Sequence, residues 1–219
     1  MKIISLNVGA PSTQRYGEQE LRTGGAKRPV PRATLRFDNF DGDGQADLAN
    51  HGGADKAVCA YPLDHYAYWE RALGRKLESA AFSENLTVSG ALETDFCVGD
   101  VFRAGGATVQ VSQPRMPCGK LAGKNGERML ARWISETGYA GFYMRVLSEG
   151  PVAAGDTLDI VERHPDRISI TDVNGVRFYG RSRDLALVER LAGLPEFAAE
   201  GRALFAECAR RLRRSARWV

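Results

Sequence analysis

Short apolar segments separated by glycine and proline recur through residues 1–165 and restrict the fold more than any other feature of the chain. Only two stretches in this part, residues 62–73 and 126–137, carry apolar side chains at helical spacing. Residues 11–25 and 151–155 are expected to be turn-rich connections. Many short strands with few helices indicate a barrel-like, mainly β fold with helical insertions, not alternating β–α units. Strands are expected at residues 3–8, 33–37, 57–61, 86–88, 98–103, 108–112, 141–147 and 156–162.

The pattern changes near His164 and Pro165, after which no clear strand follows. Three short helical patterns are predicted there, at residues 171–179, 183–192 and 195–211. We therefore expect a β domain over residues 1–165 and a small all-α domain over residues 166–219.

Composition indicates a globular protein of the cytoplasm. Of the 219 residues, 43% are hydrophobic and 26% are charged, with a net charge of +3. No apolar run approaches the roughly 20 residues that span a bilayer, so no membrane association is expected. The four cysteines lie far apart, which favours a reducing compartment without disulfides.

One cysteine has an unusual setting, in the segment SQPRMPCGK. Arg115 precedes Cys118 by three residues and Lys120 follows it by two, and nearby cations favour the thiolate. A thiolate binds soft metals or attacks electrophiles. Because Pro114 and Pro117 stiffen the backbone, we expect Cys118 on a rigid, exposed loop directly after a strand. The alternative is a loop cysteine without a function.

Three further polar sites are candidates, each with a structural alternative. The segment TGGAKR offers backbone N–H groups and the charge of Lys27 to an anion, but lacks phosphate-loop spacing and also suits a hairpin turn. His51, before two glycines, is suited to donate to an oxyanion or to cap backbone carbonyls. No G-x-S-x-G motif accompanies it, which excludes a lipase-type serine hydrolase. Asn85 offers both a donor and an acceptor, or is a turn residue.

Two metal-binding patterns fail. A calcium loop starting at Asp41 would have Ala46 in place of the required glycine and Gly52 in place of the final glutamate. The histidines near Cys59 match no zinc spacing. The chain also has a basic tail, formed by Arg210, Arg211, Arg213, Arg214 and Arg217. A solvated helix end explains these charges better than nucleic-acid binding does.

Six segments, taken in order, resemble the MOSC domain, in the branch of the bacterial 6-N-hydroxylaminopurine resistance proteins. These segments are MKIISLNVG, TGGAKRPV, DGDGQADLANHGGADKAVCAY, FSENLT, GDVF and QPRMPCGKL. The C-terminal part is similar to the three-helix domain that follows MOSC in that branch, so the resemblance spans nearly the whole chain.

The resemblance implies a MOSC-type β-barrel that binds the molybdenum cofactor (molybdopterin), followed by a small all-α domain. By position, Cys118 would be the catalytic residue and the ligand of molybdenum. Lys27, His51 and Arg115 would bind the pterin and its phosphate, with Asn85 as a further polar contact.

The implied activity is reduction of N-hydroxylated compounds, such as hydroxylaminopurines and hydroxylamines, to amines in detoxification. An external flavin or iron–sulfur reductase would supply the electrons, because the chain has neither a ferredoxin cysteine spacing nor a dinucleotide fingerprint. A homodimer is expected by analogy. The alternative is a carrier of the cofactor or of sulfur that uses the Cys118 thiolate without turnover.

Overall fold

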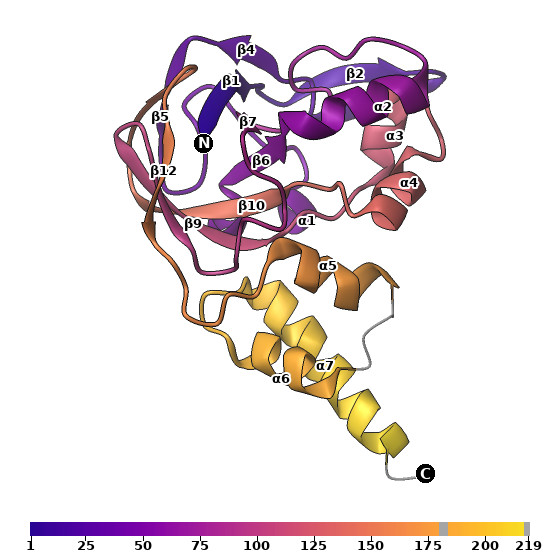
Figure 1. Cartoon of the computed structure of the whole chain (residues 1–219). Coiled ribbons are helices and arrows are strands. Elements are labelled where there is room, and N and C mark those ends of the chain that lie inside the picture. Colours follow the sequence, from indigo (N-terminus) through magenta and orange to yellow (C-terminus); the bar gives the residue numbers. More distant parts are fainter. Residues whose placement is uncertain (180–183, 217–219) are drawn as a thin grey trace.

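A sheet of eight strands forms the centre of the molecule in a computed structural model that describes residues 1–179 and 184–216 (Figure 1). Its strand order is β12-β8-β9-β10-β6-β7-β1-β4, and every neighbouring pair is antiparallel except β6 with β7. The strands are β1 (Lys2–Val8), β4 (Arg28–Val30), β6 (Val58–Pro62), β7 (Leu86–Ser89), β8 (Val101–Ala104), β9 (Ala107–Pro114), β10 (Phe142–Ser148) and β12 (Leu158–Glu162). The mainly β prediction is confirmed.

The sheet curls until its two ends meet near the N-terminus. The end of β1 pairs with β4, whereas its start bonds to the segment that leads into β12. Ile3 donates its backbone N–H to Asp156 at 2.9 Å and accepts from Gly155 at 2.8 Å. This contact is an isolated bridge, and no continuous ladder of hydrogen bonds joins β1 to β12. The barrel is therefore open between these two strands.

Two small sheets lie beside the main sheet. Three of their four strands occupy segments that were expected to be turns, and the fourth is the strand expected at residues 33–37. β2 (Ser12–Tyr16) pairs with β3 (Gln19–Thr23) across a turn at Gly17, and β5 (Arg32–Leu35) pairs with β11 (Gly150–Ala153). The β2–β3 strands are mostly exposed. They therefore lack the apolar alternation on which strand prediction relies.

Helical insertions cover one end of the sheet. They are α1 (Leu48–His51), α2 (Tyr66–Leu73), α3 (Gly119–Asn125) and α4 (Leu130–Thr137), with single 3₁₀ turns at Ala54–Lys56 and Leu63–His65. α2 and α4 confirm the two predicted helices, and Gly138 ends α4 with φ +76°. Trp69 is fully buried and donates to the Tyr61 hydroxyl at 2.6 Å. Trp69 and the buried Tyr66 of α2 therefore belong to the core, whereas Tyr68 is exposed.

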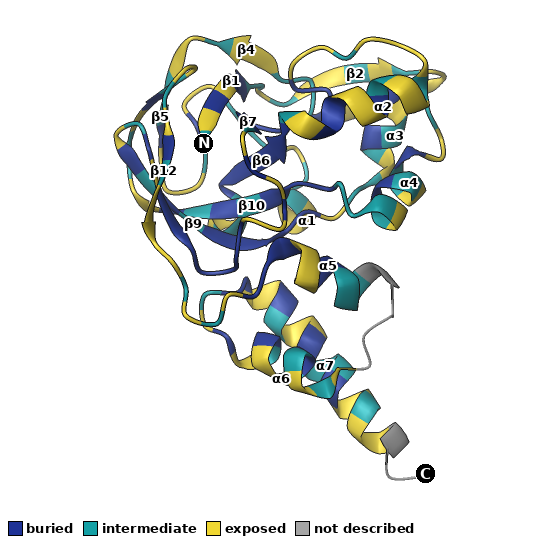
Figure 2. Ribbon diagram, viewed as in Figure 1, coloured by how far each residue is buried: buried dark blue, intermediate teal, exposed yellow. Residues whose placement is uncertain are grey.

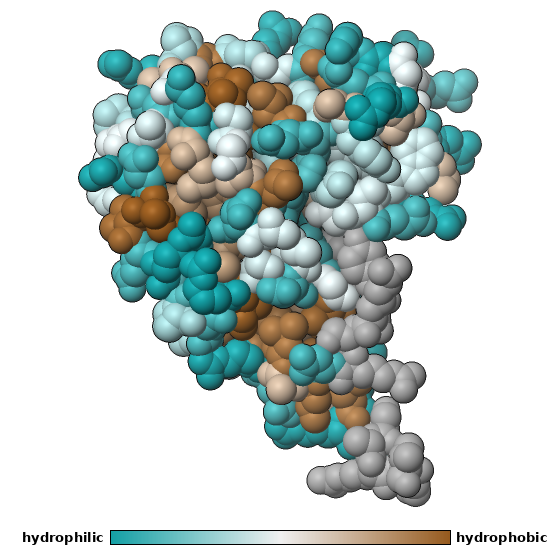
Figure 3. Space-filling model, viewed as in Figure 1, coloured by the Kyte–Doolittle hydropathy of each residue, from teal (hydrophilic) through white to brown (hydrophobic). Residues whose placement is uncertain are grey.

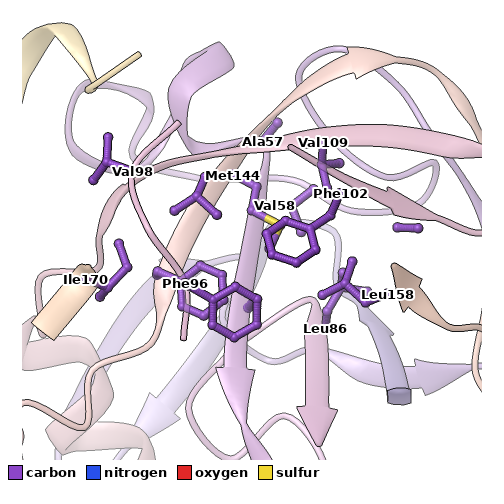
Figure 4. Packing of buried hydrophobic residues seen from close by; sticks show 14 of the residues in the cluster. Ala57, Val58, Leu86, Phe96, Val98, Phe102, Val109, Met144, Leu158 and Ile170 are labelled. Atoms are coloured by element: carbon purple, nitrogen blue, oxygen red, sulfur yellow. The ribbon is translucent and has the colours of Figure 1, made fainter. Parts of the chain in front are cut away.

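The C-terminal part forms three helices, as predicted: α5 (Ile170–Tyr179), α6 (Leu185–Gly193) and α7 (Ala199–Ala216). The predicted start of α6 at residue 183 lies outside the described residues. The helices lie directly below the sheet (Figure 1), and their buried side chains join its hydrophobic cluster. In the core close-up, Ile170 lies on the side of Phe96 and Val98 (Figure 4). The boundary at residue 165 stays a prediction.

Burial decreases from the sheet toward the helices (Figure 2). Hydrophobic residues are visible on the surface of the helical part (Figure 3). Three leucines of these helices, Leu185, Leu187 and Leu212, are partly buried and pack against the core. Among the described residues, no helix has the length and apolar character needed to cross a membrane.

Candidate functional site

A cavity opens between the helical insertions and one end of the sheet, with about 710 Å³ of empty space including its mouth. All five residues singled out from the sequence line it, although they come from four separate segments of the chain. They are Lys27, His51, Asn85, Arg115 and Cys118. Concave sites with a few convergent polar groups are where small organic ligands and cofactors bind. The fold thus brings the five candidates to one place.

Cys118 lies between the end of β9 and the first residue of α3. The backbone N–H of Arg115 donates to the Gly141 carbonyl at 3.0 Å, which anchors the loop to the start of β10. The loop directly follows a strand, as expected, but Cys118 is half-buried and not exposed. Residues 119–125 form a helix directly after Cys118, and two glycines concealed this helix in the sequence.

The Cys118 thiol ionises near neutral pH. Burial by itself would raise its pKa, but a hydrogen bond with His51 and the charge of Arg115 outweigh burial and lower the pKa to about 7. Cys59 also lines the cavity, and there burial raises the pKa of the thiol. Of these two thiols, Cys118 is therefore the one available as a thiolate at neutral pH.

Arg115 is 7% exposed, and its Nη1 has no hydrogen-bond partner among the described residues. Its guanidinium hydrogen-bonds the Tyr143 hydroxyl. Burial would lower the pKa of Arg115, but the surrounding Cys59, Tyr143 and Cys118 raise it, so the side chain remains charged. A buried polar atom without a partner is rare in folded proteins and marks a position where a ligand can bind.

Lys27 and Asn85 also line the cavity, and Asp43 joins them in a network. Lys27 pairs with the Asp43 carboxylate, whose side chain is 0% exposed. The same carboxylate accepts from Gly9 N–H at 2.8 Å and from Asn85 Nδ2 at 2.8 Å. Asn85 Oδ1 in turn accepts from the Cys59 backbone at 3.0 Å. The network joins five segments of the chain, and Lys27 and Asn85 use much of their hydrogen-bonding capacity within it.

Asp43 was missed as a site residue from the sequence. It belongs to the Asp-Gly-Asp-Gly segment that was tested only as a calcium loop. The spacing excludes a calcium loop. No local pattern indicates that Asp43 contacts a lysine earlier in the chain and an asparagine much later in it.

His51 is the last residue of α1 and not part of an open turn. Asp47 caps this short helix by accepting from Asn50 N–H, and it also pairs with Lys120 of α3 at 3.2 Å. Gly52 must remain small, since a Cβ atom there would approach the Leu48 carbonyl to 2.8 Å. These contacts place the imidazole beside Cys118.

Lys124 of α3 is a second residue that sequence reasoning missed. Its Nζ donates to the carbonyls of Gly25 and Ala80 and to Ser83 Oγ. Burial lowers the pKa of Lys124 to about 8, against the opposing charge of Glu84. Gly25 and Ser83 line the cavity, whereas Lys124 does not. Lys124 therefore stabilises part of the cavity wall through its hydrogen bonds to these two residues.

The described arginines of the basic tail do not line the cavity. Arg210 and Arg211 pair with Glu207 on the same helix, and Arg213 pairs with Glu189 of α6. Arg217 lies outside the described residues. These surface ion pairs agree with a solvated helix end.

The comparisons with known proteins agree with this arrangement. The MOSC domain model matches residues 47–159, which include His51, Asn85, Arg115 and Cys118, while Lys27 lies before the matched part. The chain is 47% identical over 204 residues to the uncharacterized protein YflK of Bacillus subtilis, covering 93% of this chain and 92% of that protein.

Two further relatives extend the comparison. The crystal structure of YiiM from Geobacillus stearothermophilus superposes with a TM-score of 0.80 at 38% identity, over 94% of this chain and 97% of that one. A protein of Gibberella moniliformis named as a reductase is 34% identical over 152 residues, covering 67% of this chain but only 27% of that protein. The family match, the near full-length relative and the shared fold lead to one conclusion: the chain belongs to the MOSC domain family.

Proposed function

We propose that this protein is a molybdenum cofactor-dependent reductase that converts N-hydroxylated compounds to amines in detoxification. The observation that carries the proposal is the pairing, in one cavity, of a Cys118 thiol with a pKa of about 7 and a buried Arg115 whose Nη1 is unpartnered. A soft ligand and a free cationic donor are the two groups that a metal dithiolene with an anionic tail requires.

The residues present fit the cofactor. Cys118 would ligate molybdenum, since a thiolate suits a metal already held by sulfur. Arg115 would bind the phosphate or the pterin through its free Nη1. Lys27 lends positive charge at the cavity, but its pairing with Asp43 makes it a weaker anion ligand than Arg115. Asn85 would help to form the cavity wall, since its amide oxygen and its amide nitrogen both hydrogen-bond to other groups of the protein.

The reaction consumes two electrons and two protons: R–NH–OH gives R–NH₂ and water. Bound in the cavity, the cofactor supplies the oxygen-atom transfer chemistry. The protein's own residues orient the ligands and manage protons. His51 hydrogen-bonds the Cys118 sulfur and favours its thiolate form. The Tyr143 hydroxyl keeps its proton at neutral pH, because burial raises its pKa.

Electrons are proposed to come from a separate flavin or iron–sulfur reductase. The chain lacks the sequence fingerprints for holding either group itself. The relative named as a reductase supports this reaction class, and its match to this chain covers about a quarter of its own length (27%).

The test is turnover by protein isolated from cells that make the cofactor. With a chemically reduced dye as electron donor, 6-N-hydroxylaminopurine should be converted to adenine, measured by chromatography. The His51→Gln variant should be slower, and a variant of the surface residue Arg213 should match the parent. Protein that carries the cofactor but converts neither 6-N-hydroxylaminopurine nor a simple hydroxylamine would contradict the proposal.

A carrier function is the second candidate, favoured by the same low pKa of Cys118. A thiolate in a cavity is suited to hold a persulfide sulfur or to store the cofactor without turnover. Sulfane sulfur on Cys118, found by mass spectrometry in protein that has no reductase activity, would replace the enzyme proposal with this one.

A further inference from the structure

A second hollow adjoins the cavity, on the side that faces the C-terminal helices. It holds about 920 Å³ of empty space, including the part open to solvent. Residues His51, Cys118 and Tyr143 line both spaces, so Cys118 stands at the wall between them. The far side of the hollow is formed by Arg177 of α5 and Glu200 of α7. These helices lie below α1 and the sheet (Figure 1).

The charges that line the hollow do not balance. Lys56 pairs with Glu200 at 2.7 Å, and Lys120 pairs with Asp47 at 3.2 Å. These two ion pairs neutralise both carboxylates of the lining. Arg177 is left without an ion pair or hydrogen bond to any carboxylate in the described parts of the chain, and Glu200 acts on it only from a distance.

Arg177 is also partly removed from water. Burial lowers its pKa, and the charge of Glu200 only partly offsets this effect, although the guanidinium remains protonated at neutral pH. A desolvated guanidinium without a partner is unfavourable in the empty protein. A carboxylate or phosphate, bound through two parallel N–H donors, would remove this cost.

We infer that the hollow is the substrate site and that Arg177 binds an anionic group of the substrate, a phosphate or a carboxylate. The N-hydroxyl end would then lie at the Cys118 wall. This inference rests on the proposed function and narrows its substrate class to N-hydroxylated nucleotides or N-hydroxylated aromatic acids, in preference to the uncharged base. It also gives the helical part a role in specificity.

Equilibrium binding of amine products tests the inference without turnover. Adenosine 5′-monophosphate, adenosine and adenine report on phosphate, and 4-aminobenzoate and aniline report on carboxylate. Calorimetry on cofactor-loaded protein should show at least one anionic product binding about tenfold to a hundredfold more tightly than its neutral counterpart. Preference for the monophosphate identifies nucleotides as the substrate class, and preference for aminobenzoate identifies aromatic acids.

Three variants assign the effect to Arg177. Arg177→Gln should abolish the preference for the anion, and Arg177→Lys should retain part of it, since one charge remains but the paired donors are lost. Arg213→Gln removes the same charge from an exposed site on α7 and should leave the preference unchanged. Circular dichroism confirms that each variant is folded.

The outcomes separate this inference from the proposed function. If anionic and neutral products bind equally, or if Arg177→Gln keeps the preference, the inference is wrong even when 6-N-hydroxylaminopurine is reduced. If an anion binds in an Arg177-dependent manner but no N-hydroxylated compound is reduced, the anion site stands and the reductase proposal fails.

Discussion

Two groups of residues at the cavity use their polar side chains in opposite ways. On the paired wall, formed by Lys27, Asp43 and Asn85, the charges and amide groups bond to one another and to the backbone. On the open wall, formed by His51, Arg115 and Cys118, a buried guanidinium nitrogen has no partner among the described residues and a thiol has a lowered pKa. The first group is bonded within the protein, whereas the second group keeps an unpaired donor and a thiol that ionises readily.

A lysine and an asparagine beside a cavity suggest ligand contacts, but here both side chains are already bonded to other groups of the protein. A buried group whose partner is missing is the better indicator of a ligand, because leaving it unpaired costs free energy in the empty protein.

Removing Asp43 should have the largest effect on stability. Asp43→Ala leaves the buried Lys27 charge unpaired and frees the Gly9 and Asn85 donors. We expect the free energy of unfolding to fall by about 3–5 kcal/mol, as for other broken buried ion pairs, measured by urea denaturation. Asp41→Ala is the matched control: Asp41 pairs with Arg36 on the surface and should contribute far less. Equal losses for the two variants would show that the network does not support the fold.

Arg115→Met should affect stability much less. The substitution removes one hydrogen bond to Tyr143 but also a desolvated charge, so we expect a loss of no more than about 1 kcal/mol. A loss as large as that of Asp43→Ala would show that the open wall is structural as well. The same variant should retain less cofactor than the parent, measured as pterin released on denaturation.

The smallest effect concerns the ionisation of Cys118 in cofactor-free protein. His51→Gln and Arg115→Met should each raise the pKa of the thiol above about 7, because each removes a group that favours the thiolate. The thiolate's ultraviolet absorbance, followed against pH with Cys118→Ala as the blank, measures the shift. An unchanged titration in both variants would show that neither group controls the thiol.

The same pKa has a consequence for stability, whose sign follows from the direction of the shift. The folded pKa of about 7 lies below the ordinary 9.0, so the thiolate stabilises the folded state. This contribution is complete above pH 9.0 and is lost as the pH falls through 7. The unfolding free energy of the cofactor-free parent, relative to Cys118→Ala, should therefore rise between these two pH values. A flat difference would contradict the lowered pKa.

Local patterns in the sequence were enough for most of the main strands, for α2 and α4 and for the three C-terminal helices. The five candidate residues came from these patterns together with the family resemblance, and the fold places all five around one cavity. Local patterns were not enough for α3, whose glycines at positions 119 and 123 weaken helix propensity, nor for the exposed β2–β3 hairpin. Asp43, Lys124 and Arg177 could not be found, because their roles depend on partners brought together only by the fold.

Cofactor content is the measurement that tests the account most directly. Parent protein, Cys118→Ala and Cys208→Ala are produced in cells that make the molybdenum cofactor, and molybdenum and pterin are measured per chain. Cys208 is half-buried on α7, away from the residues that line the cavity, and serves as the matched control. The account predicts stoichiometric molybdenum in the parent and in Cys208→Ala, and its loss in Cys118→Ala. Full molybdenum in Cys118→Ala, or none in the parent, would contradict it.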